Sequence, residues 1–402
     1  MKLYKRHIFD KIQPYIGDDT ILVLLGARQV GKTHILRYIE QYLKKRNRNT
    51  LFYDLEYPEL LALLNLGTEA FVTDLENRGH RKGEEIFVFI DEIQYLENPS
   101  SFLRIMADHH KHIRLIVSGS STFDIKTKFT DSLAGRTLQF EVFPLSFAEF
   151  LTFKESAYTN TDNLSPAGLQ QMKLLYAEYI TFGGYPKIVL EPDGTKKKQH
   201  LLQLIDTYIR KDIRDLADVT DIAKFNGLLK ILSSQSAQLL NISALSRETG
   251  ISQPTVSKYL SILEETFVIK RVTPFSRSPK VEISKNPKVF FLDSGLQTLL
   301  WLSDFPTTML GNVFETNVFG ELIKRYGRQN INYWRTKSGL EVDFVVHRNS
   351  TLTALEVKSN FQAFSDRTIT SFCRKHSITD WQVVGLEGKK TSRNALYPWE
   401  IS

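Results

Sequence analysis

Between residues 20 and 120, short apolar runs alternate with longer segments whose hydrophobic residues recur at helical spacing. The runs cover residues 21–25, 51–55, 86–90 and 113–118, and they are mostly continuous rather than alternating. Such runs are typical of strands in a parallel sheet that helices cover on both faces. The pattern therefore predicts an α/β core at the start of the chain.

The hydrophobic pattern changes further along the chain. Residues 169–191 and 199–216 show helical spacing, and residues 228–274 predict a small helical unit that ends in a β-type run. After Asn312 the pattern predicts the order helix, three strands, helix, strand. A chain of 402 residues exceeds the size at which single hydrophobic cores usually stop growing, so several domains are expected.

Composition places the chain among globular proteins, with 42% hydrophobic and 24% charged residues. Lys and Arg number 52 against 45 Asp and Glu, and the net charge of +7 permits an anionic partner such as a nucleotide or nucleic acid. The single cysteine, Cys373, excludes an intrachain disulfide and an all-cysteine metal site. No apolar run approaches the roughly 20 residues of a membrane helix, and residues 1–10 do not resemble a secretory signal. We therefore expect a soluble cytoplasmic protein without a membrane span.

A complete phosphate-binding loop follows the first apolar run. Residues 26–33 have the pattern G-x-x-x-x-G-K-T, and helical spacing continues after them. Glycines let the backbone wrap around phosphate oxygens, and the N–H groups at the start of the helix point at them. Lys32 is expected to reach the β- and γ-phosphates of ATP, and the Thr33 hydroxyl to bind Mg²⁺. The predicted nucleotide-binding residues of this loop are Gly26, Ala27, Arg28, Gln29, Val30, Gly31, Lys32, Thr33 and His34.

Two carboxylates follow the third apolar run. Asp91 is expected to hold the magnesium through water, and Glu92 to polarise the attacking water. The fourth run ends in small hydroxyl residues, of which Ser118 or Ser120 could sense the γ-phosphate. A simple Ser/Gly turn explains the same residues equally well.

Several strings together resemble a family of AAA-type ATPases in which a domain of unknown function, DUF4143, follows the ATPase. The resemblance covers nearly the whole chain and implies ATP binding and hydrolysis. It also suggests that Arg136 completes the nucleotide site of a neighbouring subunit in a homo-oligomer, and a structural salt bridge is the alternative. The strings are GARQVGKT at 26–33, IFVFIDEIQ at 86–94, SGSS at 118–121, LAGR at 133–136, PLSF at 144–147, FGGYP at 182–186, YIRKDI at 208–213 and FE at 314–315.

Residues 239–260 show the packing pattern of a helix-turn-helix, with Leu245 on the first helix and Gly250 in the turn. The runs 268–275 and 281–292 could form the β-hairpin wing of a winged helix. In DNA-binding versions the second helix enters the major groove. A module for protein contacts is the alternative, because the helix carries only one lysine and phosphate contacts dominate affinity. The residues expected to contact double-stranded DNA are Gln253, Thr255, Ser257 and Lys258.

The last part of the chain carries carboxylates and a lysine on two predicted strands. Asp343 lies on one strand, and Glu356 and Lys358 share a face of the next. The two carboxylates would hold Mg²⁺, with Glu315 as a third ligand and Lys358 to orient or deprotonate water. The string Asp343, Glu356-x-Lys358 resembles the PD-(D/E)xK nuclease superfamily, although Val342 replaces the proline. This resemblance implies metal-dependent DNA cleavage, and an inactive nuclease-like fold is the alternative.

The sequence thus predicts an α/β protein with a parallel-sheet P-loop NTPase core, a helical lid, a winged-helix module and a mixed α/β, restriction-endonuclease-like domain. The expected boundaries are residues 1–150, 151–227, 228–293 and 294–402, in that order. The expected activity is Mg²⁺-dependent ATP hydrolysis coupled to a DNA-binding half. Two alternatives stay open: a nucleotide-controlled switch for protein contacts, and a DNA-binding regulator with an inactive nuclease-like fold.

Overall fold

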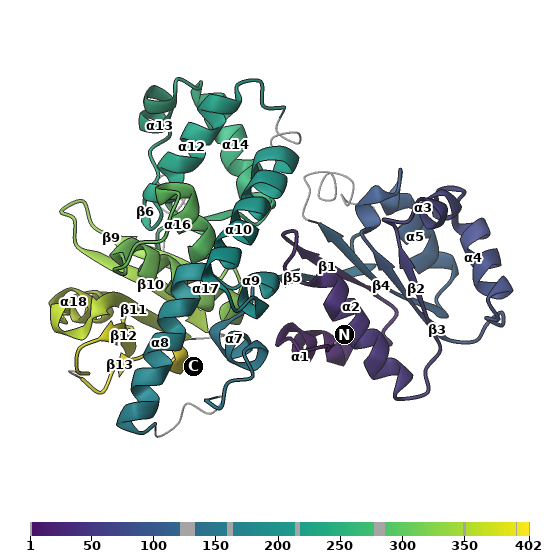
Figure 1. Cartoon of the computed structure of the whole chain (residues 1–402), viewed down its shortest axis with the longest axis horizontal. Helices are drawn as coiled ribbons and strands as arrows, with labels where there is room; N and C mark the ends of the chain where they lie inside the picture. The colour runs from purple at the N-terminus through teal and green to yellow at the C-terminus, as the bar shows by residue number, and fades with distance from the viewer. Residues whose placement is uncertain are drawn as a thin grey trace. The chain divides into compact units, whose positions relative to one another are not determined.

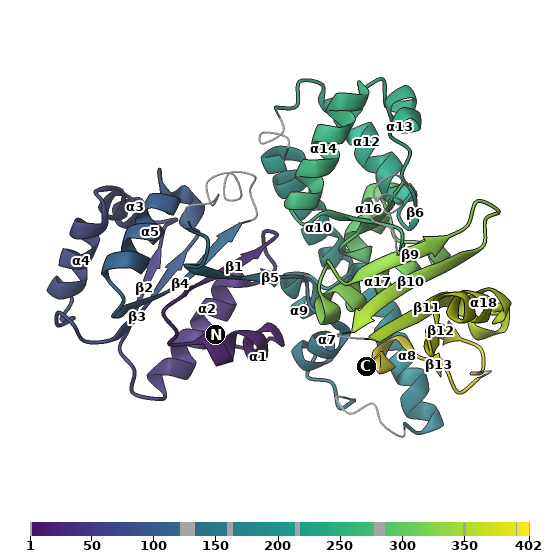
Figure 2. The same ribbon diagram turned by 180° about the vertical axis from the view of Figure 1, so that it is seen from behind.

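The computed structural model describes residues 2–120, 133–158, 164–213, 218–276, 286–348, 351–390 and 392–401, with the backbone alone for residues 210–212. Ser121 and residues 281–285 of the predicted wing lie outside the described residues. The chain forms two compact units (Figures 1 and 2): unit 1 is Met1–Phe143 with Glu265–Phe267, and unit 2 is Pro144–Glu264 with Val268–Ser402. The finer four-part division stays a prediction. None of the helices in the described ranges is long and apolar enough to span a membrane.

Unit 1 contains a parallel sheet whose described strands have the order β2-β3-β4-β1-β5. Strands β1 and β3 are buried along their whole length, as expected for the interior of a parallel sheet. The four predicted strands are confirmed. β5 is missing from the prediction because its polar and apolar residues alternate, which is typical of a half-exposed edge strand. The strands are β1 (Ile21–Gly26), β2 (Thr50–Asp54), β3 (Ile86–Asp91), β4 (Ile113–Ser120) and β5 (Thr137–Val142).

The first long helix of unit 1 follows the phosphate loop directly. It begins at Lys32, after Gly31, whose φ of 94° is unfavourable for other residues. Its buried residues between Ile35 and Leu43 recur at helical spacing, and the helix packs against the sheet. The helices of unit 1 are α1 (Ile8–Ile12), α2 (Lys32–Lys44), α3 (Pro58–Asn65), α4 (Thr68–Asn77) and α5 (Pro99–His109), with 3-10 turns at Gln13–Tyr15 and Ile93–Tyr95.

Unit 2 opens with helices, one of which is interrupted. The prediction of a continuous helix over residues 169–191 is wrong, because one helix ends at Phe182 and the next begins at Pro186. Gly183 has a φ of +77°, and a Cβ there would lie 2.1 Å from Oδ1 of Asp293. The chain therefore turns at a point where only glycine fits.

The helix predicted over residues 199–216 begins earlier than expected. It starts at Gly194, because the Asp193 side chain caps it by accepting a hydrogen bond from the Lys196 N–H at 2.8 Å. It then continues into a π-helical segment. The helices of this part are α7 (Phe147–Phe153), α8 (Pro166–Phe182), α9 (Pro186–Leu190), α10 (Gly194–Leu204) and the π-helix Ile205–Ile213.

Two helices joined by a tight turn and a small antiparallel sheet come next in unit 2. The turn contains Gly250, with a φ of 66°, and Leu245 and Leu260 on the flanking helices are buried. The two runs predicted as a hairpin contribute β7 and β8, which pair antiparallel in the order β6-β8-β7. These elements are α12 (Ile222–Ser234), β6 (Gln238–Leu239), α13 (Ile242–Thr249), α14 (Gln253–Glu265), β7 (Ile269–Val272) and β8 (Lys288–Phe291).

The last part of unit 2 is a mixed sheet whose described strands have the order β13-β12-β11-β10-β9. Strands β9, β10 and β11 pair antiparallel, whereas β11, β12 and β13 pair parallel. Phe372 on α18 packs in a core with Val342 and Ala354. The predicted order of helix, three strands, helix and strand is confirmed. The elements are α16 (Ser294–Leu302), α17 (Gly311–Tyr326), β9 (Ile331–Arg335), β10 (Glu341–Arg348), β11 (Thr351–Asn360), α18 (Arg367–His376), β12 (Asp380–Glu387) and β13 (Ala395–Leu396), with 3-10 turns at Phe361–Ala363 and Pro398–Glu400.

Candidate functional site

The candidate nucleotide site of unit 1 lies where β1 leads into α2. The backbone of the connecting loop is left-handed at Gln29, with a φ of 61°, and at Gly31, with a φ of 94°. A loop of this kind directs backbone N–H groups and the start of a helix toward an anion. The strand, loop and helix that the sequence predicts around residues 26–33 are therefore all present.

The Lys32 side chain lies inside this loop. Its ammonium donates hydrogen bonds to the carbonyl oxygens of Gly26 and Ala27, at 3.1 and 3.0 Å, and the residue is only 4% exposed. Burial lowers the pKa of Lys32, although the carboxylates of Glu92 and Asp91 oppose this effect. The loop thus holds the buried Lys32 ammonium close to the place where the loop would bind phosphate.

Asp91 lies at the end of β3 and is buried. The Ser118 hydroxyl donates a hydrogen bond to its Oδ1 atom. Burial raises the pKa of Asp91, while hydrogen bonds from Ser118 and Thr33 partly offset that rise. The Thr33 hydroxyl and the Asp91 carboxylate therefore lie together. An oxygen donor pair of this kind is the type that Mg²⁺ prefers.

The adjacent Glu92 is fixed by contacts that the sequence did not predict. Its backbone is left-handed, with a φ of 57°, and its N–H donates to the Ser118 hydroxyl at 3.2 Å. The Gln94 amide donates a hydrogen bond to the Glu92 carboxylate and accepts one from the Ser120 N–H at 3.2 Å. Gln94 thus connects the end of β3 to the end of β4. The only sequence pattern that could have indicated Gln94 is its position, two residues after the second of the paired carboxylates.

The two serines at the end of β4 have different surroundings. The Ser118 hydroxyl is occupied by Asp91 and by the Glu92 N–H. The Ser120 hydroxyl oxygen is buried and has no hydrogen-bond partner among the described residues. Since a buried hydroxyl normally has a partner, Ser120 is the better candidate for the γ-phosphate contact.

Two further carboxylates lie near this site. Asp54 ends β2 in register with Asp91 at the end of β3. Burial raises the pKa of Glu56, and the carboxylates of Asp54 and Glu92 raise it further. Neither Asp54 nor Glu56 was predicted as a site residue. An acidic residue at the end of a predicted strand was the pattern that could have indicated them. Together they make the carboxyl edge of the sheet strongly negative, which favours a cation.

Arg6, near the start of the chain, links the phosphate loop to the residue that follows β5. Its guanidinium donates to the Val30 carbonyl and to the Phe143 carbonyl, both at 2.8 Å, and the residue is 6% exposed. Val30 belongs to the phosphate loop, and Phe143 is the residue after β5. No sequence motif marks this arginine, because its partners lie 24 and 137 positions away.

Two other predicted residues of unit 1 lie at the surface. His34 is an exposed residue in the first turn of α2. Arg136 is partly exposed, and its guanidinium pairs with the two carboxylate oxygens of Asp108, at 2.7 and 3.1 Å. The hydrogen bond that Arg136 donates to the Asp108 carboxylate raises the pKa of Arg136. This pair is the structural salt bridge that the sequence analysis considered as the alternative role.

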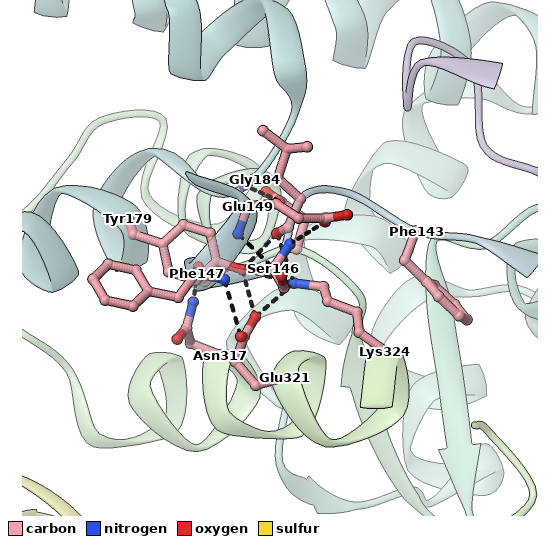
Figure 3. Close-up of polar contacts among 12 residues, drawn as sticks. Phe143, Ser146, Phe147, Glu149, Tyr179, Gly184, Asn317, Glu321 and Lys324 are labelled. Atoms are coloured by element: carbon pink, nitrogen blue, oxygen red, sulfur yellow. Dashed lines mark hydrogen bonds and ion pairs between the residues drawn. The ribbon is translucent and has the colours of Figure 1, made fainter. Parts of the chain in front are cut away.

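The strings at 144–147 and 182–186 come together in a polar network in unit 2 (Figure 3). The Leu145 N–H donates to the Gly184 carbonyl at 2.7 Å, and the Leu145 carbonyl accepts from Lys324 at 3.0 Å. Lys324 also pairs with Glu321 at 2.9 Å, and the Glu321 carboxylate accepts from the Phe147 N–H at 3.0 Å. These strings therefore meet one another and fix the backbone at the start of unit 2.

Tyr179 lies at the centre of that network. Its hydroxyl is 2.6 Å from a Glu321 oxygen and 2.7 Å from the Leu145 carbonyl, and Lys324 donates to it at 2.7 Å. Burial raises the pKa of Tyr179, and the Glu321 carboxylate raises it further. Tyr179 therefore stays a neutral phenol that positions the backbone around Leu145.

The second predicted constellation, Asp343, Glu356 and Lys358, comes together on β10 and β11. The Lys358 ammonium lies 2.7 Å from a Glu356 oxygen and 3.8 Å from Oδ2 of Asp343. The Asp343 Oδ2 atom also accepts from the Val357 N–H at 2.8 Å. Burial raises the pKa of Glu356 to about 7, and the Asp343 carboxylate contributes to that rise. The predicted convergence of these three side chains is present.

The predicted metal site around them stays a prediction, and ammonium groups lie beside its carboxylates. Among the described residues, no group of three or more His, Cys, Asp or Glu side chains could hold a metal ion. Glu315, the expected third ligand, instead pairs at 3.0 Å with Lys288, a buried lysine on β8. Lys288 was not predicted as a site residue, because it is the first residue of a short, otherwise apolar strand and lies outside any motif. The ammonium groups of Lys288 and Lys358 stand beside the carboxylates that were expected to bind Mg²⁺.

The residues predicted to contact DNA lie on α14. Gln253 and Lys258 are exposed, whereas Thr255 and Ser257 are partly buried. The Lys258 ammonium lies 3.4 Å from Oδ2 of Asp218, and both side chains are at least half exposed. A loose pair of this kind contributes little to stability.

Comparison with protein families assigns three parts of the chain. Residues 18–151 match the AAA domain, residues 173–307 match the domain of unknown function DUF8612, and residues 310–397 match the domain of unknown function DUF4143. The strand–loop–helix of unit 1 thus lies in the part of the chain that is similar to the AAA domain, and the mixed sheet of unit 2 lies in the part that is similar to DUF4143. The resemblance that the sequence suggested is confirmed to this extent.

Related proteins cover most of the chain. An uncharacterized protein of Haemophilus influenzae is 26% identical over 347 residues, which are 84% of this chain and 82% of that protein. An uncharacterized protein of Methanocaldococcus jannaschii is 27% identical over 360 residues, or 86% and 75% of the two chains. Among solved structures, AMPPCP-bound DnaA from Aquifex aeolicus is 13% identical over 64% of this chain and 86% of its own, with a TM-score of 0.33.

Proposed function

We propose that unit 1 binds ATP together with Mg²⁺ and hydrolyses it. The observation that carries this proposal is the position of Lys32, a buried ammonium at the start of α2 that lies inside a strand–loop–helix. The carboxylates of Glu92 and Asp91, at the end of β3, favour the charged form of that ammonium and raise its pKa against the effect of burial. A cation beside backbone N–H groups, with carboxylates opposite, is what triphosphate hydrolysis requires.

Each residue has a distinct role in this proposal. Lys32 neutralises the β- and γ-phosphate charge, and the phosphate loop holds the phosphate oxygens through its N–H groups. Thr33 and Asp91 would hold the Mg²⁺, which supplies charge neutralisation on the β- and γ-oxygens when it is bound. Glu92 orients and polarises the attacking water, Ser120 contacts the γ-phosphate, and Arg136 completes a neighbouring site only if it leaves Asp108.

Two substitutions test the proposal. Lys32→Ala should abolish ATP binding, because the phosphate charge loses its main partner. Glu92→Gln should retain ATP binding and lower kcat by about 10²–10⁴-fold, the usual contribution of a general base. Titration with a fluorescent ATP analogue and a phosphate-release assay measure the two effects. Normal ATP binding by Lys32→Ala would refute the nucleotide site, and a wild-type rate in Glu92→Gln would refute only the role of Glu92.

For unit 2 we propose that α14 contacts duplex DNA, in a cytoplasmic protein that responds to its nucleotide state. The support is the exposure of Gln253 and Lys258 on α14, the second of two helices that a tight turn joins. Thr255 and Ser257 lie on the same helix and would add hydrogen bonds at the edge of the DNA major groove. We derive no cleavage step, because the ammonium groups of Lys288 and Lys358 lie beside the carboxylates that a metal ion would need.

Fluorescence anisotropy with a labelled duplex tests this second function. The double variant Gln253→Ala/Lys258→Ala should weaken binding, and wild-type affinity should fall as salt rises, because DNA binding releases counterions. Lys196→Ala is the matched control, since it removes one exposed lysine from another helix of unit 2. A wild-type affinity that does not change with salt would contradict electrostatic DNA binding. Unchanged binding in the double variant would exclude α14 as the contact.

A further inference from the structure

Lys288 lies at the centre of a charge cluster in unit 2 that joins three elements. Its side chain is 3% exposed, and its ammonium is 3.0 Å from Oε1 of Glu315 on α17 and 2.5 Å from Oε1 of Glu341 on β10. The other Glu341 oxygen accepts from Arg335 at 2.7 Å. The lysine itself comes from β8, a strand of a different sheet. The ammonium is therefore surrounded by carboxylates from two neighbouring elements.

The adjacent carboxylates are balanced in the same way. Lys358 lies 2.7 Å from Glu356 and 3.8 Å from Asp343, and the Asp343 Oδ2 atom also accepts a backbone hydrogen bond from Val357 at 2.8 Å. Each of the four carboxylates, those of Glu315, Glu341, Asp343 and Glu356, thus has an ammonium within 4 Å. The cluster already contains its own cations.

We infer that Lys288 is the resident cation of this cluster and that its ammonium excludes Mg²⁺ or Mn²⁺ from the carboxylates around it. A divalent ion that bound Glu315 or Glu341 would stand a few ångströms from the buried Lys288 ammonium, on whose charge the Asp343 carboxylate also acts, and like charges at that distance repel strongly. Moving the ammonium away instead would leave a buried cation without partners, which is also costly. Either route opposes metal binding.

The surroundings of Lys288 hold it in place. The next residue but one, Phe290, stacks on Phe319 with ring centroids 4.4 Å apart, and Phe319 stacks on Phe344 at 5.9 Å. These rings join β8, α17 and β10, the same elements that the ion pairs join. Burial opposes the charge on Lys288, but the Glu315, Asp343 and Glu341 carboxylates outweigh it and raise the pKa of the lysine. The ammonium therefore stays charged and in position at neutral pH.

The cluster would consequently stabilise unit 2 rather than perform metal chemistry. It ties the small sheet that contains β8 to the mixed sheet that contains β10, through the helix α17. This role is independent of ATP hydrolysis in unit 1, so the two proposals can fail separately.

Titration of the nucleotide-free full-length protein with Mn²⁺, followed by the electron paramagnetic resonance signal of the free ion, tests the inference. Wild type and Asp343→Asn should give the same curve, because neither binds Mn²⁺ at the cluster. Lys288→Met should gain a site at least 10-fold tighter than any that wild type shows, and Lys288→Met/Asp343→Asn should lose that site again. Lys270→Met is the matched control, since it removes a part-buried lysine that pairs with Glu264 at 2.7 Å.

Two results would overturn the inference. The first is Mn²⁺ binding by wild type that Asp343→Asn removes, which shows a metal site in the presence of Lys288. The second is a folded Lys288→Met protein, verified by circular dichroism, that gains no site. If Lys288→Met does not fold, the comparison of wild type with Asp343→Asn still decides, because it involves the native lysine.

Discussion

Gly26 at the end of β1 lies directly against Val142 at the end of β5. The two residues are in register across a parallel pair of strands. A Cβ on Gly26 would lie 2.2 Å from the Val142 carbonyl oxygen, which is far closer than any real contact. The first glycine of the phosphate loop is therefore required by packing within the sheet as well as by the approach of phosphate.

Gly26→Ala should lower both stability and nucleotide affinity. The added methyl group must push β5 away from β1, and overpacking of this kind costs about 1–3 kcal/mol. Gly227→Ala on α12 is the control, because nothing lies within 4 Å of its Cβ position. It should instead stabilise the protein by roughly 0.5–1 kcal/mol, since alanine is a better helix former than glycine. Urea unfolding measures both changes, and equal effects of the two substitutions would contradict the packing role of Gly26.

Gln94→Ala should lower kcat about 10-fold and leave KM nearly unchanged, because the Gln94 amide orients the Glu92 carboxylate without contacting substrate. A steady-state ATPase assay gives both constants. In a Glu92→Gln background the same substitution should have no further effect, since the oriented group is already disabled. An equal loss in both backgrounds would show that Gln94 acts independently of Glu92.

Arg6→Ala should destabilise unit 1 by about 1–3 kcal/mol, because it removes a buried donor from two backbone carbonyls. ATP affinity should fall too, since one of those carbonyls belongs to Val30 in the phosphate loop. Arg46→Ala is the matched control: Arg46 also donates to a backbone carbonyl, that of Tyr42 at 3.2 Å, but it is exposed. Its effect should stay within about 0.5 kcal/mol. Equal urea midpoints for the two variants would contradict the role of Arg6.

The contribution of His112 to stability should fall as the pH drops below about 6.5, where histidine in an unfolded chain becomes protonated. Burial lowers the pKa of His112 in the folded protein, and the neighbouring His80 ring, stacked with its centroid 5.7 Å away, lowers it further. The unfolded chain therefore binds the proton first, so this contribution is present above that pH and lost below it. Lowering the pH from 7.5 to 5.5 should therefore move the urea midpoint further downward in wild type than in His112→Gln, and an equal shift in the two proteins would exclude His112.

The nucleotide site shows how much of a functional site local sequence patterns can predict. A phosphate loop is contiguous, so residues 26–33 specify a strand end, a turn and a helix start by themselves. Asp91 and Glu92 could be placed because they follow a continuously apolar run. The edge strand β5 alternates polar and apolar residues, so the criterion that found the interior strands could not find it.

The contiguous patterns of the phosphate loop and of the interior strands thus determined those elements and the residues at their ends, whereas the break between Phe182 and Pro186 was not found. The partners that complete those elements come from elsewhere: Arg6 reaches Phe143, Tyr179 reaches Glu321, and Lys288 reaches Glu315. Such contacts join separate elements and leave no periodic trace in the sequence. Only the tertiary structure could therefore decide that Lys288 stands beside the carboxylates at which a metal ion was expected, because a buried charge is held by whichever opposite charges the fold brings to it.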